Sequence, residues 1–253
     1  MFAKRSQEPA GEPAAAAPEG TRLYAVGDCH GRLDLLCALE EEILEDAEAH
    51  PADRKVVVYL GDYVDRGPDS SGVIDHLTAA PLKGFESIHL LGNHEAMMLA
   101  FLRAGAAAGL TWLINGGEET LASYGLDVAA LKQEPDPLER LREGLDAQLP
   151  DSHRDFLESL KRWHREGDYL FVHAGLRPGQ PLERQDPEDL IWIREPFLNS
   201  AKDHGCVVVH GHTPAREPVE KPNRIGIDTA AVYGGALTAL VLEGAGRRYL
   251  QVR

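Results

Sequence analysis

The chain has 253 residues, of which 43% are hydrophobic, and a formal net charge of −15 at pH 7. This size and composition suit one large α/β domain, and the negative charge argues against a nucleic-acid partner, because phosphate backbones require a basic surface. Cys29, Cys37 and Cys206 are scattered and odd in number, which predicts no disulfide framework and favours a reducing, cytoplasmic location. No apolar run reaches the length of a membrane span, so no membrane partner is expected.

Residues 1–20 are rich in Ala, Pro and Glu and contain almost no large apolar side chain. Such a segment cannot bury enough surface to offset its conformational entropy, so we expect a disordered tail. The remaining residues, 21–253, are expected to form a single domain.

Three apolar stretches each end in glycine and then present polar side chains, and each is predicted as a strand. The strands cover residues 23–26, 55–60 and 87–91, followed by Gly-Asp-Cys-His-Gly, Gly-Asp-Tyr-Val-Asp-Arg-Gly and Gly-Asn-His-Glu. The middle stretch is β-branched and continuous, which is typical of a buried parallel strand. Because open α/β sheets bind ligands at the carboxyl ends of their strands, we expect these polar side chains to gather there.

A helix is predicted after each of these loops. Apolar residues recur at helical spacing over residues 32–48, opposite an acidic face that we interpret as solvated. A second helix is expected near residues 71–79, ending before Pro81, and a third begins at Asn93. The repeated strand, loop and helix indicate a layered α/β sheet.

Residues 104–166 break this alternation. Two groups of apolar side chains recur there at helical spacing, and prolines separate the pieces: Leu138, Leu141, Leu145 and Leu149, then Phe156, Leu160 and Trp163. We predict a mostly helical cap inserted between two halves of the sheet. The cap includes Trp-Leu-Ile-Asn-Gly-Gly at residues 112–117, whose role the composition does not indicate.

The remainder of the chain is rich in strands. Those from residue 224 onward are short and separated by glycine-rich turns, which suits antiparallel pairing. The predicted strands cover residues 169–172, 206–209, 224–228, 236–243 and 247–252, the last of them at a sheet edge. The first of these strands leads into His173, and the second leads into His-Gly-His-Thr-Pro at residues 210–214.

The motifs Gly-Asp-x-His-Gly, Gly-Asp-x-Val-Asp-Arg-Gly and Gly-Asn-His-Glu, in this order, resemble the signature of the phosphoprotein phosphatase branch of the metallophosphoesterases. The chain is most similar to the small bacterial and bacteriophage serine/threonine phosphatases. The resemblance implies a mixed α/β (α+β) fold, a calcineurin-like metallophosphoesterase β-sandwich flanked by helices. It also implies a serine/threonine protein phosphatase that hydrolyses phosphomonoesters, in which a bridging hydroxide between two divalent metals attacks phosphorus in line. The substrate would be a phosphoprotein or a small phosphorylated molecule.

The same resemblance implies the ligands of two metal ions, bridged by Asp62. One set is Asp28, His30 and Asp62, and the other is Asp62, Asn93, His173 and His212. Mixed nitrogen and oxygen ligands suit Mn, Fe or Zn better than Ca, and of these divalent transition metals Mn is our first expectation. Many metallophosphoesterases have a second ligating histidine where this chain has Pro214, and its absence is the phosphoprotein phosphatase pattern.

The other histidines lie outside the ligand motifs. His210 is on the same side of its strand as His212 and could approach the site, but we expect a supporting role or none. Cys29 is expected to be a packed side chain. The remaining histidines match no motif and are expected to be ordinary core or surface residues: His50, His76, His89, His153, His164 and His204.

Four further residues acquire roles from the resemblance. Arg66 and Arg194 would bind phosphate oxygens, for which forked guanidinium groups are well suited. His94 would be the general acid that protonates the departing alkoxide, and Asp65 would orient its imidazole.

Two other functions compete with this interpretation. Symmetric bis(5'-nucleosyl)-tetraphosphatases, which are dinucleoside polyphosphate hydrolases, share the fold and the metal set. They tend to read Asn-His-Asp and to lack Thr-Pro after the last ligand, so Glu95 and Pro214 favour the phosphatase. A non-enzymatic, metal-dependent binding module is disfavoured, because such a module needs no general acid such as His94. The sequence does not decide whether phosphotyrosine is accepted.

Overall fold

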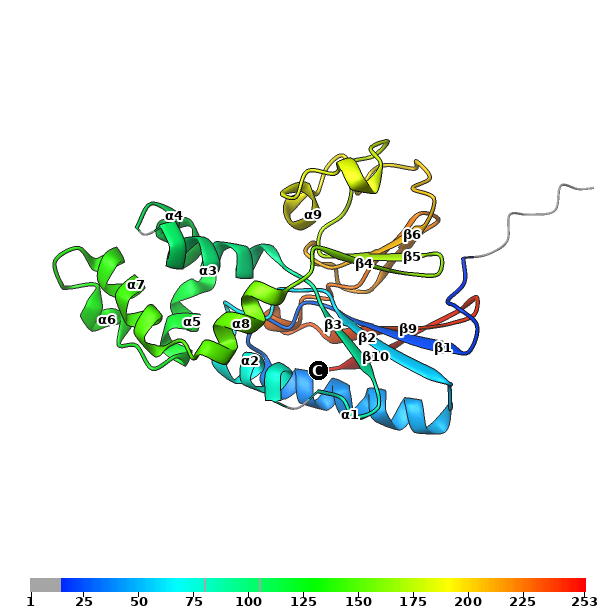
Figure 1. Cartoon of the computed structure of the whole chain (residues 1–253), viewed down its shortest axis with the longest axis horizontal. Helices are drawn as coiled ribbons and strands as arrows, with labels where there is room; N and C mark the ends of the chain where they lie inside the picture. Colours follow the sequence, from blue (N-terminus) through cyan, green and yellow to red (C-terminus); the bar gives the residue numbers. More distant parts are fainter. Residues whose placement is uncertain (1–14, 80, 105) are drawn as a thin grey trace, which may run out of the picture.

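Two five-stranded sheets form the centre of the molecule in this computed structural model, which describes residues 15–79, 81–104 and 106–253 (Figure 1). The strands are β1 Thr21–Val26, β2 Arg54–Tyr59, β3 Glu86–His89, β4 Trp163–Glu166, β5 Tyr169–Val172, β6 Val207–His210, β7 Val219–Lys221, β8 Arg224–Gly226, β9 Leu237–Glu243 and β10 Gly246–Val252. Their orders are β10-β9-β1-β2-β3 and β4-β5-β6-β8-β7. This arrangement confirms the expected mixed α/β sandwich.

The strands that lead into the candidate ligands are joined by parallel pairs, and β4, β7, β9 and β10 each pair antiparallel with a neighbour. Strands β1, β2 and β3 are parallel, as are β5, β6 and β8. Strand β10 lies at an edge, as predicted, and pairs antiparallel with β9. The expectation of antiparallel pairing was wrong for β8 on one side, since β8 pairs parallel with β6 and antiparallel with β7.

Alternation along the strands divides the core into layers. Leu23 and Ala25 of β1 face the second sheet and pack in one cluster with Phe171 of β5. Tyr24 and Val26 point the other way and pack against the helices. The central strands are therefore buried on both faces, which explains their continuous apolar sequences.

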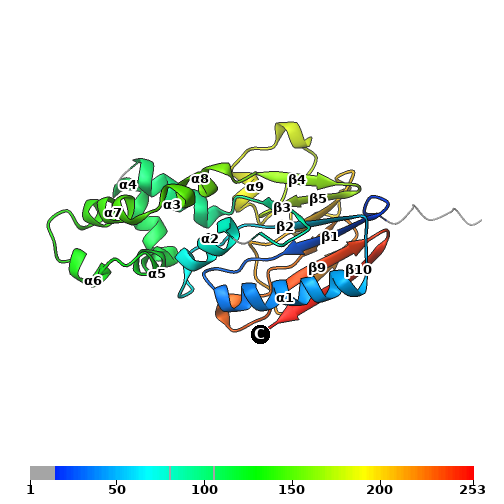
Figure 2. The same ribbon diagram turned by 60° about the horizontal axis from the view of Figure 1, so that its bottom comes forward.

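Helices cover the outer faces of both sheets. Figure 2 shows α1 Leu33–Ala49 lying along the first sheet, with α2 Ser70–Ala79 beside it. The short helix α9 Asp189–Trp192 packs on the second sheet, where Ile191 joins a cluster with Leu170. Two further short turns are η2 Leu182–Arg184 and η3 Ala231–Tyr233. Among the described residues, no helix has the length and apolar character to cross a membrane.

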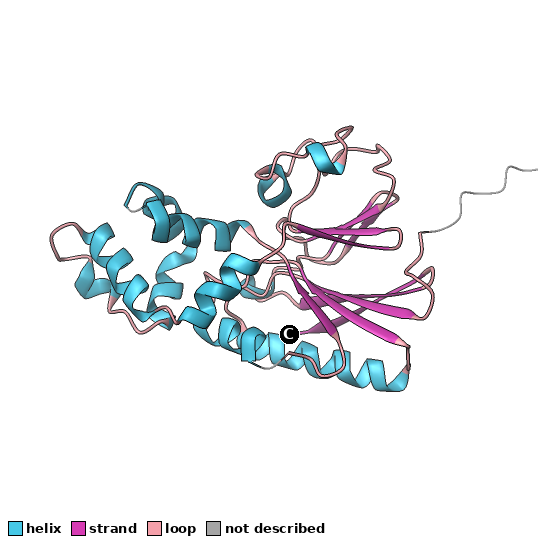
Figure 3. Ribbon diagram, viewed as in Figure 1, coloured by secondary structure: helices cyan, strands magenta, loops and turns pink. Residues whose placement is uncertain are grey.

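The cap is a group of helices at one end of the sandwich (Figure 3). It follows α3 Asn93–Ala104 and comprises α4 Ala106–Trp112, the π-helical turn η1 Leu113–Gly117, α5 Glu118–Ser123, α6 Val128–Leu131, α7 Pro137–Gln148 and α8 Asp151–Ser159. The helical spacing that ended at Trp163 was misleading, because α8 ends at Ser159 and Trp163 begins β4. Leu160 is extended, and Lys161 donates its backbone N–H to the carbonyl of His89, which returns the chain to the sheets.

The last residues of the expected disordered tail lie against the sandwich. The backbone N–H of Ala17 donates to the carbonyl of Gly244 at 2.8 Å, and that of Ala16 donates to Asp168 Oδ2 at 3.0 Å. The Tyr169 hydroxyl donates to the carbonyl of Ala15 at 3.0 Å. Small alanine side chains allow this close approach, so the expected boundary at residue 20 was too late. The expectation for residues 1–14 falls outside the described residues.

Candidate metal centre and active site

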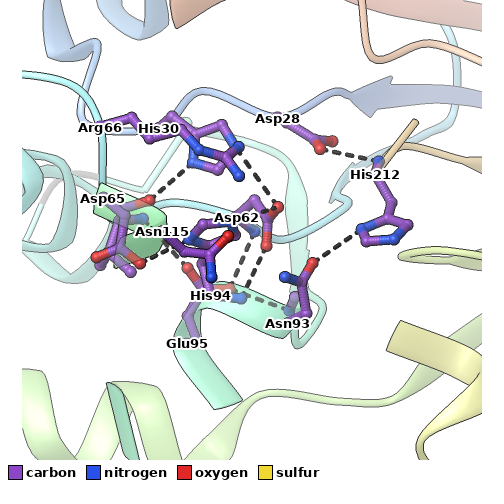
Figure 4. Close-up of polar contacts among 12 residues, drawn as sticks. Asp28, His30, Asp62, Asp65, Arg66, Asn93, His94, Glu95, Asn115 and His212 are labelled. Carbon is purple, nitrogen blue, oxygen red and sulfur yellow. Dashed lines mark hydrogen bonds and ion pairs between the residues drawn. The ribbon is translucent and has the colours of Figure 1, made fainter. Parts of the chain in front are cut away.

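Six side chains that were predicted to lie at strand ends come together, and Figure 4 labels all of them except His173. All six are buried, and they follow five different strands: Asp28 and His30 after β1, Asp62 after β2, Asn93 after β3, His173 after β5 and His212 after β6. The first three strands belong to one sheet and the last two to the other. The site therefore lies between the two sheets.

One group of donor atoms surrounds Asn93. Its Oδ1 lies 3.0 Å from His173 Nε2 and 2.9 Å from His212 Nδ1, and His173 Nε2 lies 3.3 Å from Asp62 Oδ1. His173 Nδ1 donates to the carbonyl of Leu60 at 2.9 Å. A neutral His173 with that tautomer directs its Nε2 lone pair at the oxygens of Asn93 and Asp62. Such facing lone pairs repel one another unless a proton or a metal cation lies between them.

A second group surrounds the other oxygen of Asp62. His30 Nδ1 donates to the carbonyl of Val64 at 2.8 Å, and its Nε2 lies 3.5 Å from Asp62 Oδ2 and 2.6 Å from Arg66 NH1. Asp28 Oδ2 accepts from the backbone N–H of His212 at 2.8 Å. Asp28 Oδ1 is buried and has no hydrogen-bond partner among the described residues. A buried carboxylate oxygen without a donor fits a metal ligand.

The charges at this end of the sandwich also favour a cation. Burial and the neighbouring carboxylate of Asp228 raise the pKa of Asp28 well above its usual range. Burial alone would lower the pKa of His173, but the carboxylates of Asp62 and Asp28 raise it to about 10. A divalent cation would relieve this repulsion and replace the proton on His173. With mixed imidazole, carboxylate and amide donors, the residues present fit two divalent transition-metal ions.

Backbone strain is concentrated in the same loops. Among the described residues, seven non-glycine positions have positive φ, and five of them belong to the site: His30 (44°), Asp62 (53°), Asp65 (75°), Arg66 (68°) and His212 (64°). Left-handed conformations are costly for such residues and persist only where the surroundings enforce them. Gly61 has φ of 103°, and a Cβ there would lie 2.6 Å from the backbone N of Gly92. Only glycine permits the two loops to approach this closely.

Glu95 holds the loop that carries Asp62. Its carboxylate is fully buried and accepts four backbone N–H groups, from Asp62 (2.9 Å), Tyr63 (2.7 Å), Val64 (3.1 Å) and Gly92 (3.0 Å). This role of Glu95 was not predicted from the sequence, where the residue served only to distinguish two families. The signal was present, since a glutamate three residues after Gly92 can cap the start of α3 and reach the neighbouring loop.

His94 and Asp65 form a buried pair beside the ligand groups. His94 Nδ1 lies 2.6 Å from Asp65 Oδ2, and His94 Nε2 lies 4.0 Å from Asp62 Oδ2. Burial lowers the pKa of His94 to about 4 and raises that of Asp65, and hydrogen bonds from Thr120 and Trp112 oppose the rise in Asp65. A short hydrogen bond thus joins the two side chains, and His94 Nε2 faces Asp62 of the ligand cluster.

Three comparisons place this site among known proteins. Residues 21–236 match the model of the calcineurin-like phosphoesterase family. The chain belongs to that family.

Its relatives are named either as protein phosphatases or as dinucleoside tetraphosphatases. Serine/threonine-protein phosphatase 1 of Salmonella typhimurium is 31% identical over 229 residues, covering 85% of this chain and 89% of that protein. The asymmetrical bis(5'-nucleosyl)-tetraphosphatase PrpE of Bacillus thuringiensis is 26% identical over 236 residues, covering 85% and 88%. A crystal structure of a candidate diadenosine tetraphosphatase is 25% identical, with a TM-score of 0.57 and coverage of 95% and 99%. This calcineurin-like phosphoesterase is therefore a hydrolase of phosphoester bonds.

Two arginines of this phosphoesterase differ in how the fold holds them. Arg66 contacts His30 and lies with its guanidinium carbon 5.8 Å from the centre of the Tyr233 ring. Arg194 is exposed, on the segment after α9. Burial and His173 lower the pKa of His212 to about 3, and the positive charge of Arg194 contributes to that shift. Arg194 is therefore close enough to influence the ligand cluster electrostatically.

The histidines expected to be ordinary have partners elsewhere in the phosphoesterase fold. His153 is buried between the Tyr124 hydroxyl and Asp75 Oδ1, each at 2.8 Å. His210 is also buried, and its Nε2 lies 3.2 Å from Arg224 NH1 and not among the ligand atoms. Cys29 is packed in the core, as expected. The residues that sequence reasoning missed, besides Glu95, are Trp112 and Thr120 of the cap, which contact Asp65.

Proposed function

We propose that this hydrolase is a metal-dependent serine/threonine protein phosphatase acting on phosphomonoesters. The observation that carries the proposal is the buried His94–Asp65 pair, at 2.6 Å, beside the ligand cluster. A phosphomonoester with an alkoxide leaving group needs a proton as its P–O bond breaks, and this pair can supply one. A binding module would have no use for such a pair.

The proposed roles follow from where each side chain lies. Two ions would be held by Asp28, His30, Asp62, Asn93, His173 and His212, with Asp62 shared. When bound, divalent ions supply Lewis acidity and generate a nucleophile from water at neutral pH.

The remaining steps belong to the chain itself. Arg66 and Arg194 would bind and orient the phosphate oxygens. In its protonated form, His94 would donate the Nε2 proton to the leaving oxygen, while Nδ1–H stays hydrogen-bonded to Asp65. We propose Mn as the first candidate metal, with Fe or Zn as alternatives. We also propose a cytoplasmic location, because Cys29, Cys37 and Cys206 are all free thiols.

A second candidate function is the hydrolysis of dinucleoside polyphosphates. Exposed aromatic rings flank the ligand cluster on two sides: Tyr233, which is 66% exposed, adjoins Arg66, and Trp192, which is 38% exposed, lies with its ring centre 6.1 Å from that of His212. Such rings can stack on nucleobases. The tetraphosphatases among the relatives are named asymmetrical. The alternative weighed from the sequence was the symmetric tetraphosphatase.

Turnover of three substrates by one preparation tests these proposals. A phosphoserine peptide, a phosphotyrosine peptide and diadenosine tetraphosphate would be compared with Mn present, after chelation, and after readdition of Mn, Fe or Zn. The protein phosphatase proposal expects the highest kcat/KM with phosphoserine, and loss of activity on chelation that readdition restores. Preference for the dinucleotide, with a rise in its KM alone in Tyr233→Ala and Trp192→Ala, would establish the second candidate. Full turnover after verified metal removal would exclude both.

A further inference from the structure

Two side chains of the cap converge on the carboxylate of Asp65. Trp112 Nε1 donates to both of its oxygens, at 3.0 Å to Oδ1 and 2.9 Å to Oδ2. The Thr120 hydroxyl donates to Oδ1 at 2.6 Å and accepts from the Asp65 backbone N–H at 2.9 Å. These residues are 47 and 55 positions away from Asp65 in the sequence. The cap and the loop after β2 therefore meet at this one group.

The contacts around Asp65 are fully enclosed. Asp65, Trp112 and Thr120 each have a relative exposure of 0%. A buried carboxylate requires donors on both oxygens. The Thr120 hydroxyl donates to Oδ1, Trp112 Nε1 donates to both oxygens, and His94 Nδ1 lies 2.6 Å from Oδ2. The donors thus fix the plane of the carboxylate and the direction in which Oδ2 meets the imidazole.

The neighbouring part of the cap also holds the backbone next to Asp65. The carbonyl of Gly116 accepts the backbone N–H of Arg66 at 3.1 Å. Gly116 has φ of 104°, and a Cβ there would lie 2.7 Å from the Arg66 N. The segment from Trp112 to Thr120 therefore contacts the loop after β2 through both side chains and backbone.

We propose that Trp112 and Thr120 are positioning residues for His94, acting through Asp65, so that the cap forms part of the apparatus that delivers the proton. The inference rests on the proposed general-acid role of His94. A purely structural role would make the same contacts, because any buried carboxylate needs donors. The two roles differ in consequence: a structural defect slows all substrates alike, whereas a misaligned acid slows only those that need a proton.

Variants that remove one donor at a time distinguish the two roles. Thr120→Val removes the hydroxyl and keeps the shape, and Thr120→Ser restores the hydroxyl. Trp112→Phe removes the indole N–H. Tyr124→Phe is the matched control, because it removes a buried cap hydrogen bond, the 2.8 Å contact with His153, without touching Asp65. His94→Asn is the reference for loss of the acid.

Each variant would be assayed on phenyl phosphate, whose leaving group needs protonation, and on p-nitrophenyl phosphate, whose leaving group hardly does. Metal content and thermal midpoint would be measured in parallel. We expect Thr120→Val and Trp112→Phe to lower kcat on phenyl phosphate by about tenfold or more, with less than a threefold loss on p-nitrophenyl phosphate. Thr120→Ser should resemble the parent, and Tyr124→Phe should affect both substrates equally. The low-field proton resonance of His94 Nδ1–H should shift in Thr120→Val and not in Tyr124→Phe.

The possible outcomes distinguish the positioning role of Trp112 and Thr120 from the general-acid role of His94, on which it rests. Selective loss in His94→Asn, with equal or no loss on the two substrates in Thr120→Val, would overturn the positioning role alone. No selective loss in His94→Asn would overturn the general-acid role and the inference with it. Should Trp112→Phe fail to fold, Thr120→Val and its serine counterpart decide the question.

Discussion

Replacing Glu95 with glutamine should disrupt the loop after β2. One carboxylate oxygen accepts from Tyr63 and Val64, at 2.7 and 3.1 Å, and the other accepts from Asp62 and Gly92, at 2.9 and 3.0 Å. An amide keeps one oxygen and turns its NH₂ toward two backbone donors, whichever way it is flipped. At about 1–3 kcal/mol for each buried group left unsatisfied, Glu95→Gln should lose roughly 2–6 kcal/mol of unfolding free energy.

Urea unfolding of the parent and the variant measures this loss as a shift in midpoint at constant m-value. Glu158→Gln is a suitable control, because Glu158 forms an exposed ion pair with Arg103 and its loss should cost less than about 1 kcal/mol. Glu95→Gln should also bind metal more weakly, since the affected loop carries Asp62. A Glu95→Gln protein within about 0.5 kcal/mol of the parent would refute the reasoning, because losing or weakening four hydrogen bonds to one buried carboxyl group should cost more than that.

Four further substitutions test other parts of the structure. Asp62→Asn should lose both metal and turnover, and two retained ions per chain by metal analysis would contradict the bridging role. Arg66→Ala and Arg194→Ala should weaken competitive inhibition by inorganic phosphate, by about 1.5–3 kcal/mol for each lost charged contact, with metal content unchanged. Unaltered phosphate inhibition in Arg194→Ala would show that this exposed side chain does not reach the substrate. Burial raises the pKa of Asp46, but the ion pair with Arg248, together with smaller contributions, outweighs burial and lowers that pKa below its usual value. The ionised Asp46 therefore stabilises the native state at pH values above the pKa of Asp46 in the unfolded chain, and this contribution is lost as the pH falls. The difference in unfolding free energy between the parent and Asp46→Asn should be largest at pH 7 and should shrink below about pH 4, which unfolding measured at each pH would show.

The sequence carried most of the information about the strand ends. Apolar runs that end in glycine predicted the strands, and the rule that ligands bind at carboxyl ends predicted that Asp28, Asp62 and Asn93 would meet. Their order along the chain matched a known signature, which added His173 and His212 from the second sheet. Local patterns sufficed because each of these residues follows its strand within a few positions.

Other features depend on tertiary contacts that no local pattern reveals. Trp163 continues the helical spacing of Phe156 and Leu160, yet pairing with Val172 draws it into β4. Thr120 and Trp112 look like ordinary cap residues in the sequence. Their contacts with Asp65 join residues that are 55 and 47 positions apart, so no local pattern could predict them. The alanine-rich composition of residues 1–20 predicted a disordered tail. Ala16 and Ala17 nevertheless form backbone hydrogen bonds to the sandwich, and such bonds do not depend on a large side chain.

The division of the ligands between two sheets links metal occupancy to heat resistance. Asp62 approaches from the first sheet and His173 from the second, and their facing atoms are 3.3 Å apart. A cation held between them would tie the sheets together at the end nearest the cap, and it would bind only the folded chain. By mass action, a free metal concentration of a thousand times Kd adds about 4 kcal/mol to the unfolding free energy. The melting temperature should then rise steadily with metal concentration, and substrate need not be present for the site to be titrated.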